Sequence, residues 1–182
     1  MYIEFSDFCL RSINGFDAES YLALYSHPEV ARFDDYTPIS REDLAGEMKR
    51  IEGYHDNSAF LELAVASRYD NKMMGVITLD SKRKYCYLGY HFHPDFQGKG
   101  YAVRSVMGLL ENMDETRRQT MRLVSHPENK ASISLAEKVG FVYVGRRKLK
   151  GVPEVVYRFD SIQWASRRMQ TLRSIRVSTC VV

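Results

Sequence analysis

Two glycines stand between a predicted strand and a predicted helix, in the segment Gln97–Ala102 (QGKGYA). Residues 85–93 read as a strand, and the apolar spacing of three and four from Val103 to Met113 predicts a helix. Glycines at such a junction let the main chain approach a ligand, and the free N–H groups of the first helical turn favour an anion. No Ser or Thr follows a lysine as in a P-loop, so the pattern favours a pyrophosphate cradle of another kind, or a plain tight turn.

A second segment with possible chemistry begins at His126, where a predicted strand over 120–125 ends. Asn129 and Ser132 follow at the start of a short predicted helix, for which Gly140 is a suitable C-cap. Asn is a common helix N-cap and Ser is common in a first turn, so both residues also have a purely structural interpretation. The same amide and hydroxyl could hydrogen-bond a ligand at that place.

Together the two segments resemble the GNAT family of acyl-CoA N-acetyltransferases, and most closely its RimJ/RimL-like branch of ribosomal-protein N-terminal acetyltransferases. Two ordered motifs at family spacing are far more specific than either alone. The likeness covers about residues 7–160 and also includes segments 27–33 and 144–147. It rests on residues 88–94 (LGYHFHP), the loop Gln97-x-x-Gly100-x-Ala102, and Pro127-Glu128-Asn129-x-x-Ser132 with Glu137-Lys138-x-Gly140-Phe141.

The resemblance implies an α+β fold: a mixed, mostly antiparallel sheet of about seven strands, helices on both faces and a splay between two central parallel strands. The residue pattern agrees, with a helix expected from Asp17, whose carboxylate can cap it, and another after the capping-box-like Ser40-x-x-Asp43. We expect one domain over residues 1–162 and a basic, helical extension over 163–182. Strands are expected at 8–12, 59–68, 73–80, 85–93, 120–125, 141–149 and 154–159.

The resemblance further implies that acetyl-CoA is the co-substrate. Main-chain groups of the strand before the glycine loop would pair with the pantetheine arm, as an added strand would. The loop and the first turn of the helix would hold the pyrophosphate, with Arg104 and Lys130 adding charge nearby. The residues expected at the cofactor are His91, Phe92, His93, Gln97, Gly98, Lys99, Gly100, Tyr101, Ala102, Val103, Asn129 and Ser132.

Acetyl transfer to an amine requires a proton to leave the amine and another to reach the departing thiolate. Family members often place a Tyr seven residues after the motif Asn as the thiol acid, but this chain has Ala136 there. The RimL-like comparison then assigns Ser132 to that role. Many branch members carry a Glu where this chain has Tyr87, so we take Glu62 as the catalytic carboxylate. The alternative bases are His91, His93, Asp34 and Asp35.

The acceptor is expected to be a primary amine, either a protein N-terminus or a small molecule, bound between residues 27–39 and 145–155. Asp34, Asp35 and Tyr87 are the predicted substrate-binding residues. His91 and His93 share one strand face, but no third ligand is spaced near them, so no metal is predicted. The alternative function is a non-catalytic acyl-CoA sensor or scaffold, favoured by the absence of the usual Tyr and Glu.

Composition is that of a compact globular protein, with 45% hydrophobic and 27% charged residues among 182. Three scattered cysteines, no signal-peptide pattern and no apolar run of about eighteen residues lead us to expect a cytoplasmic protein without a membrane partner. The net charge of +3 resides in the C-terminal segment. That arginine-rich segment is read as a docked helix, with a nucleic-acid contact as the weaker alternative, and a homodimer is possible by analogy.

Overall fold

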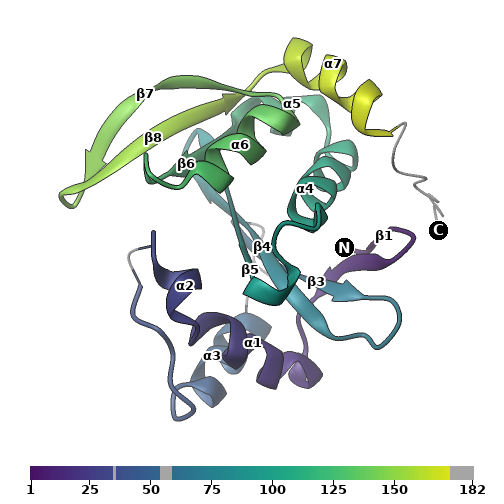
Figure 1. Cartoon of the computed structure of the whole chain (residues 1–182), viewed down its shortest axis with the longest axis vertical. Helices are drawn as coiled ribbons and strands as arrows, with labels where there is room; N and C mark the ends of the chain where they lie inside the picture. Colours follow the sequence, from purple (N-terminus) through teal and green to yellow (C-terminus); the bar gives the residue numbers. More distant parts are fainter. Residues whose placement is uncertain (35, 54–58, 173–182) are drawn as a thin grey trace.

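The computed structural model describes residues 1–34, 36–53 and 59–172. Within them, eight strands form one sheet in the order β1-β2-β3-β4-β5-β6-β8-β7, and only β5 and β6 are parallel neighbours (Figure 1). The α+β class and the mixed, mostly antiparallel sheet are confirmed. The strands are β1 (Ile3–Glu4), β2 (Phe8–Ser12), β3 (Phe60–Ser67), β4 (Met73–Lys82), β5 (Tyr85–Phe92), β6 (Met121–Ser125), β7 (Phe141–Leu149) and β8 (Val152–Phe159).

Helices cover both faces of the sheet, and a separate apolar core lies under each layer. One core joins α1, α2 and α3 to one face of β3 and β4, and the other joins α4, α6 and α7 to the opposite face of the sheet, β3 and β4 included. Two short 3-10 helices, η1 (Gly15–Asp17) and η2 (Pro94–Phe96), complete the elements. The α-helices are α1 (Ala18–Tyr25), α2 (Pro28–Ala31), α3 (Leu44–Glu52), α4 (Tyr101–Glu111), α5 (Glu115–Thr120), α6 (Lys130–Val139) and α7 (Ser161–Leu172).

The two parallel strands separate part of the way along their length. They are paired from Cys86 and Met121 up to Leu88 and Leu123. Beyond that point β5 stays paired with β4 as far as Phe92, while β6 stays paired with β8. The predicted splay therefore lies beside the last four residues of β5, where one edge of the strand has no neighbouring strand.

Most predicted elements are found within a few residues, and the differences have local causes. The two-residue strand β1 raises the number of strands above the expected seven. The short helices α2 and α5 were not predicted, because neither is long enough to show apolar periodicity. The capping box predicted from Ser40 and Asp43 before α3 does form: the Ser40 N–H and hydroxyl donate to Asp43 Oδ2 at 2.9 and 2.6 Å.

Asp17 does not cap α1, so that expectation is wrong. Its carboxylate is buried and accepts two hydrogen bonds from the Arg11 guanidinium, at 2.7 and 2.8 Å. It also accepts from the Asn14 N–H at 3.0 Å, which closes a capping box on η1 instead. A buried carboxylate is stabilised far more by a cationic partner than by a helix N–H alone, and this decides its orientation.

The helix expected in the C-terminal segment is present as α7, which begins two residues before the predicted boundary at 163. Its Trp164 is buried and packs against Gly140, the left-handed C-cap of α6. A Cβ on Gly140 would come within 2.6 Å of the Trp164 main chain, so only glycine allows this approach. Residues 173–182, including Arg173 and Arg176, lie outside the described residues. None of the described helices is long and apolar enough to cross a membrane.

Candidate active site

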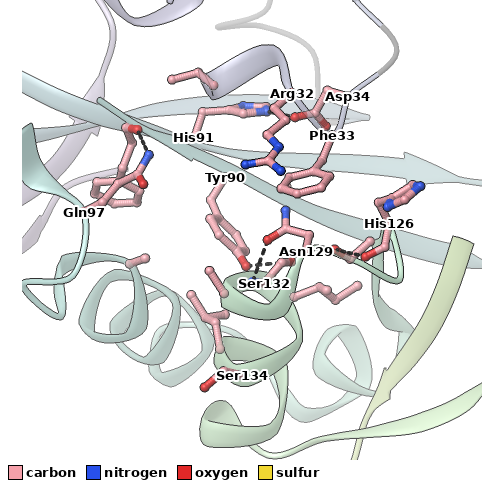
Figure 2. A pocket seen from close by; sticks show the side chains of 18 of the residues that line it. Arg32, Phe33, Asp34, Tyr90, His91, Gln97, His126, Asn129, Ser132 and Ser134 are labelled. Atoms are coloured by element: carbon pink, nitrogen blue, oxygen red, sulfur yellow. Dashed lines mark hydrogen bonds and ion pairs between the residues drawn. The ribbon is translucent and has the colours of Figure 1, made fainter. Parts of the chain in front are cut away.

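A cavity of about 790 Å³ lies where β5 and β6 separate. Its walls include residues of α2 from one face of the sheet and of α4 and α6 from the other, so the cavity passes between the strands. Tyr90 and His91 are neighbours on β5 and leave the strand in opposite directions (Figure 2). The Tyr90 side chain therefore lies on the side of α4 and α6, and the His91 side chain lies on the side of α1 and α2.

The open edge of β5 presents main-chain groups to this cavity. The His93 N–H donates to the Met74 carbonyl at 3.1 Å, which shows that the odd-numbered residues here turn their main chain toward β4. The main-chain groups of Tyr90 and Phe92 therefore face the splay, and the Phe92 carbonyl accepts from the Gln97 side chain at 2.8 Å. Of the three residues predicted to pair with the pantetheine arm, Phe92 has this orientation, whereas His91 and His93 turn their main chain the other way.

The glycine loop forms the other end of the cavity. Gly98 and Gly100 have positive φ angles of 70° and 79°, and Gly100 is the N-cap residue of α4. No side chain of the described residues caps this helix, so its first-turn N–H groups are open to an anionic ligand. The predicted loop residues that line the cavity are Gln97, Gly98, Gly100, Tyr101, Ala102 and Val103, and Lys99 lies outside the lining.

Arg104 follows the loop but does not line the cavity. Its guanidinium donates two hydrogen bonds to the Asp7 carboxylate, at 2.6 and 2.7 Å, and stacks over Phe8 and Tyr101. Hydrogen bonding to Arg104 lowers the pKa of Asp7 below its usual range. Arg104 thus ties the start of α4 to the first strands of the sheet and does not supply the charge near the phosphates expected from the sequence.

A chain of hydroxyl and amide groups lines the side of α6. The Ser132 N–H donates to the Asn129 side-chain oxygen at 3.0 Å, so Asn129 is the N-cap of α6. The Tyr90 hydroxyl donates to Ser132 Oγ at 2.8 Å (Figure 2). Burial raises the pKa of Tyr90 to about 12. The sequence analysis missed Tyr90, because the contact joins residues 42 positions apart and only the alternation along β5 pointed toward it.

A histidine–carboxylate pair lies on the opposite side. His91 Nε2 is 3.1 Å from Asp34 Oδ2, and both residues line the cavity. The other ring nitrogen, Nδ1, is 3.4 Å from the hydroxyl of Tyr25 on α1. Two of the predicted alternative bases are therefore brought together. Asp35, predicted beside them, lies outside the described residues.

Aromatic and charged side chains form the rim on this side. Phe33, from the segment after α2, stacks on His126 at the end of β6, with ring centroids 5.6 Å apart. The Arg32 guanidinium lies over the same Phe33 ring at 5.0 Å. The turn between β7 and β8 completes the wall, so the two segments predicted to line an acceptor site do border the cavity. The lining residues next to this turn are Leu149 at the end of β7 and Val152, Pro153 and Glu154 at the start of β8.

Besides Lys99 and His93, two further predicted site residues, Tyr87 and Glu62, do not line the cavity. Tyr87 lies on the paired part of β5, where the Arg147 guanidinium is 5.8 Å from its ring centroid. Glu62 is only 4% exposed beneath α1 and α3, and its Oε1 accepts from the Tyr21 and Tyr25 hydroxyls, each at 3.3 Å. Burial raises the pKa of Glu62, while the nearby Arg50 charge opposes this rise.

A sheet that opens between two parallel strands beside an uncapped, glycine-led helix defines the fold of an acyl-CoA-dependent acetyltransferase. Residues 7–142 match the model of the acetyltransferase (GNAT) domain. The chain belongs to the GNAT acetyltransferase family, whose members use acetyl-CoA. A comparison with curated proteins gives no match.

Solved structures with the same fold include several acetyltransferases. A GNAT acetyltransferase from Bacillus anthracis has a TM-score of 0.73 at 19% identity, covering 86% of this chain and 96% of that one. RimL, a ribosomal L7/L12 alpha-N-protein acetyltransferase in complex with coenzyme A, has a TM-score of 0.72 at 18% identity, covering 88% and 99%. The microcin C7 self-immunity acetyltransferase MccE, in complex with acetyl-CoA and AMP, has a TM-score of 0.71 at 19% identity, covering 84% and 91%.

Proposed function

We propose that this protein transfers the acetyl group of acetyl-CoA directly to a primary amine, on a protein N-terminus or a small molecule. The observation that carries the proposal is one cavity with two different walls. A hydrogen-bonded pair of hydroxyls, Tyr90 and Ser132, lies on one wall, and the His91–Asp34 pair lies on the other. Acyl transfer to an amine needs a proton donor for the leaving thiolate and a proton acceptor for the amine, and these walls supply one each.

The residues at the cavity fit acetyl-CoA. The uncapped first turn of α4 has N–H groups for a pyrophosphate, and the open edge of Tyr90 and Phe92 has main-chain groups for an extended arm. Positive φ angles at Gly98 and Gly100 give the loop the curvature that a phosphate cradle needs. Acetyl-CoA supplies an activated acetyl group and a sulfur leaving group, and the chain supplies position and protons.

On the wall next to α6, Ser132 is the group assigned to the leaving sulfur. Its oxygen already accepts a hydrogen bond from Tyr90, so its own hydrogen is free to be directed into the cavity. With its pKa at about 12, Tyr90 remains protonated at neutral pH and can replace the proton that Ser132 gives up. This pair compensates for Ala136, where the family often has a tyrosine acid.

On the opposite wall, the Asp34 carboxylate attracts the ammonium form of the acceptor. Its side chain is 44% exposed, and it stands beside the imidazole of His91. His91 then takes the proton from the bound amine, which leaves a neutral nitrogen able to attack the thioester. Asp34 remains in place to stabilise the imidazolium that forms, because an opposite charge within about 4 Å favours the charged form.

Calorimetric titration with acetyl-CoA tests the proposal. We expect the parent protein to bind and Gly100→Glu to lose binding by at least about 100-fold, because the substitution adds backbone strain and a negative charge at the pyrophosphate site. Gly100→Asn is the matched control: Asn tolerates positive φ, so it should bind more tightly than the Glu variant. Absence of binding by the parent would refute the proposal.

Release of free thiol from acetyl-CoA, measured with a panel of peptide N-termini and small amines, separates the enzyme from its alternative. Release with any one acceptor supports turnover and identifies the class of amine. Tight binding of acetyl-CoA without release with any acceptor would favour the non-catalytic sensor or scaffold.

A further inference from the structure

We propose that buried Glu62 acts as a positioning residue for the acceptor-side base, and that the single hydroxyl hydrogen of Tyr25 couples Glu62 to His91. This inference rests on the proposed function, because it assigns Glu62 and Tyr25 to the proton transfer from the amine. It also changes the role expected from the sequence. Glu62 does not reach the cavity, so it cannot touch either substrate and must act through another group.

The geometry is a continuous chain of polar contacts drawn from four elements. It begins at Glu62 on β3, passes through the Tyr25 hydroxyl on α1 at 3.3 Å, and reaches His91 Nδ1 on β5 at 3.4 Å. From there, Nε2 of the same ring is 3.1 Å from Asp34 in the segment after α2. The buried carboxylate is thereby linked through one hydroxyl and one imidazole to the wall of the cavity.

Counting hydrogens shows why Tyr25 couples the two ends. Burial and the charge of Glu62 raise the pKa of Tyr25 far above its usual value, so its hydroxyl keeps one hydrogen. That hydrogen is donated to Glu62 Oε1, so the Tyr25 oxygen is left to accept from the Nδ1–H of His91. Neutral His91 then carries its hydrogen on Nδ1, and Nε2, beside Asp34 on the cavity wall, is the nitrogen that takes the proton of the amine. Glu62 thereby sets, through Tyr25, the tautomer of His91 that the base requires.

The remaining groups around Glu62 show how much its carboxylate depends on the Tyr25 hydroxyl. Tyr21 donates to the same Oε1 atom, and Arg50 on α3 lies 3.9 Å from Oε2. Oε2 has no hydrogen-bond partner among the described residues, so the carboxylate depends on the bonds at Oε1. Glu47 on α3 is a further acidic group near it, and Tyr36 packs its ring edge against His91. Glu62 therefore keeps the Tyr25 oxygen oriented as the acceptor for His91 Nδ1.

A pH titration of the His91 imidazole by NMR, on the protein without substrates, tests the coupling directly. The midpoint should move to lower pH in Glu62→Gln and in Tyr25→Phe, because each removes support for the imidazolium. The double variant should shift no further than the larger single shift, since both substitutions remove one interaction. A His91→Gln spectrum assigns the signal among the five histidines.

Tyr21→Phe is the matched control. It removes a hydrogen bond to the same Glu62 oxygen at the same distance, but Tyr21 has no described hydrogen bond to His91. We expect a clearly smaller shift than in Tyr25→Phe. Equal shifts in the two tyrosine variants, or an unchanged midpoint in Glu62→Gln, would overturn the proposal.

The kinetic experiment compares kcat/KM against pH for the same variants. Tyr25→Phe and Glu62→Gln should each lower the plateau about tenfold, as expected for a weakened base, and move the acid limb to lower pH. The acceptor amine titrates identically in all variants, so its contribution cancels in the ratios. Absence of turnover in the parent would refute the proposed function, whereas the NMR midpoints would still decide whether Glu62 and His91 are coupled.

Discussion

The two walls of the cavity are built in different ways. The wall of α4 and α6 consists mainly of main-chain N–H groups and helix-start residues, held by contacts within each motif, such as Asn129 to Ser132. The wall of His91 and Asp34 consists of side chains from β5 and the segment after α2, with Tyr25 of α1 and Glu62 of β3 behind them, and these contacts cross up to 66 positions of sequence. In the proposed function, the first wall binds acetyl-CoA, the co-substrate of the whole family, whereas the second wall binds the acceptor amine.

This difference teaches where the specificity of the enzyme lies. Main-chain groups and helix dipoles are indifferent to side-chain identity, so a cofactor site built from them tolerates sequence change. In a site assembled from side chains that are distant in sequence, a single substitution can change one contact and leave the others in place. The following predictions either sharpen this contrast or break it.

Ser132→Ala should give the largest loss, about 100-fold in kcat, because the leaving thiolate loses its proton donor. The affinity for acetyl-CoA should change far less, since the main-chain contacts remain. Rates of thiol release at saturating acetyl-CoA and amine, together with calorimetry, measure both quantities.

Tyr90→Phe is the companion to this variant. It leaves the Ser132 hydroxyl in place but removes its donor, so the loss in kcat should be smaller than for Ser132→Ala. An unchanged rate in Ser132→Ala would remove Ser132 from the mechanism and would leave the chemistry to the other wall alone.

Asp34→Asn should have an intermediate effect, expressed mainly in KM for the amine, which should rise about tenfold, or about 1.4 kcal/mol of binding. The reason is that Asp34 attracts the cationic acceptor beside His91. Glu29→Gln is the matched control, because it removes the same charge from the lining of the same cavity, and Glu29 has no described hydrogen bond to His91. Similar KM increases in both would show that the wall acts by general electrostatic attraction and not by a specific pair.

Asp7→Asn should have the smallest effect, a loss of about 1 kcal/mol in the free energy of unfolding at neutral pH, as for a well-formed bidentate ion pair near the surface. Because Arg104 lowers the pKa of Asp7, this stabilisation is present above the unfolded pKa and is lost as the pH falls through the folded pKa. Denaturant unfolding at pH 7 and near pH 2 should therefore show a difference that disappears in acid. A difference that persists in acid would mean that packing of Arg104 on Phe8, and not its charge, holds the start of α4.

The sequence predicted the wall of α4 and α6 well, because a glycine loop, an N-cap Asn and a C-cap Gly are each signalled within a few residues. It predicted the wall of His91 and Asp34 only as a set of candidate residues, without their contacts. Nothing in the local pattern shows that His91 meets Asp34, or, on the other wall, that Tyr90 bonds to Ser132. Contacts between residues distant in sequence also determine where charged side chains point: Arg104 pairs with Asp7, 97 positions earlier.

The close approach of α7 to Gly140 has a mechanical consequence for Ser132, the hydroxyl that we propose as the proton donor. Ser132 lies in the first turn of α6 and Gly140 follows its last turn, so a stiff helical segment of about 12 Å joins the two. Trp164 packs against the C-terminal end of this segment, while the Tyr90 hydroxyl bonds to Ser132 at its N-terminal end. A side chain added at residue 140 would push α6 and α7 apart, and α6 carries Ser132, the proposed proton donor, at its other end. The packing of the C-terminal helix against Gly140 therefore helps to set the position of Ser132.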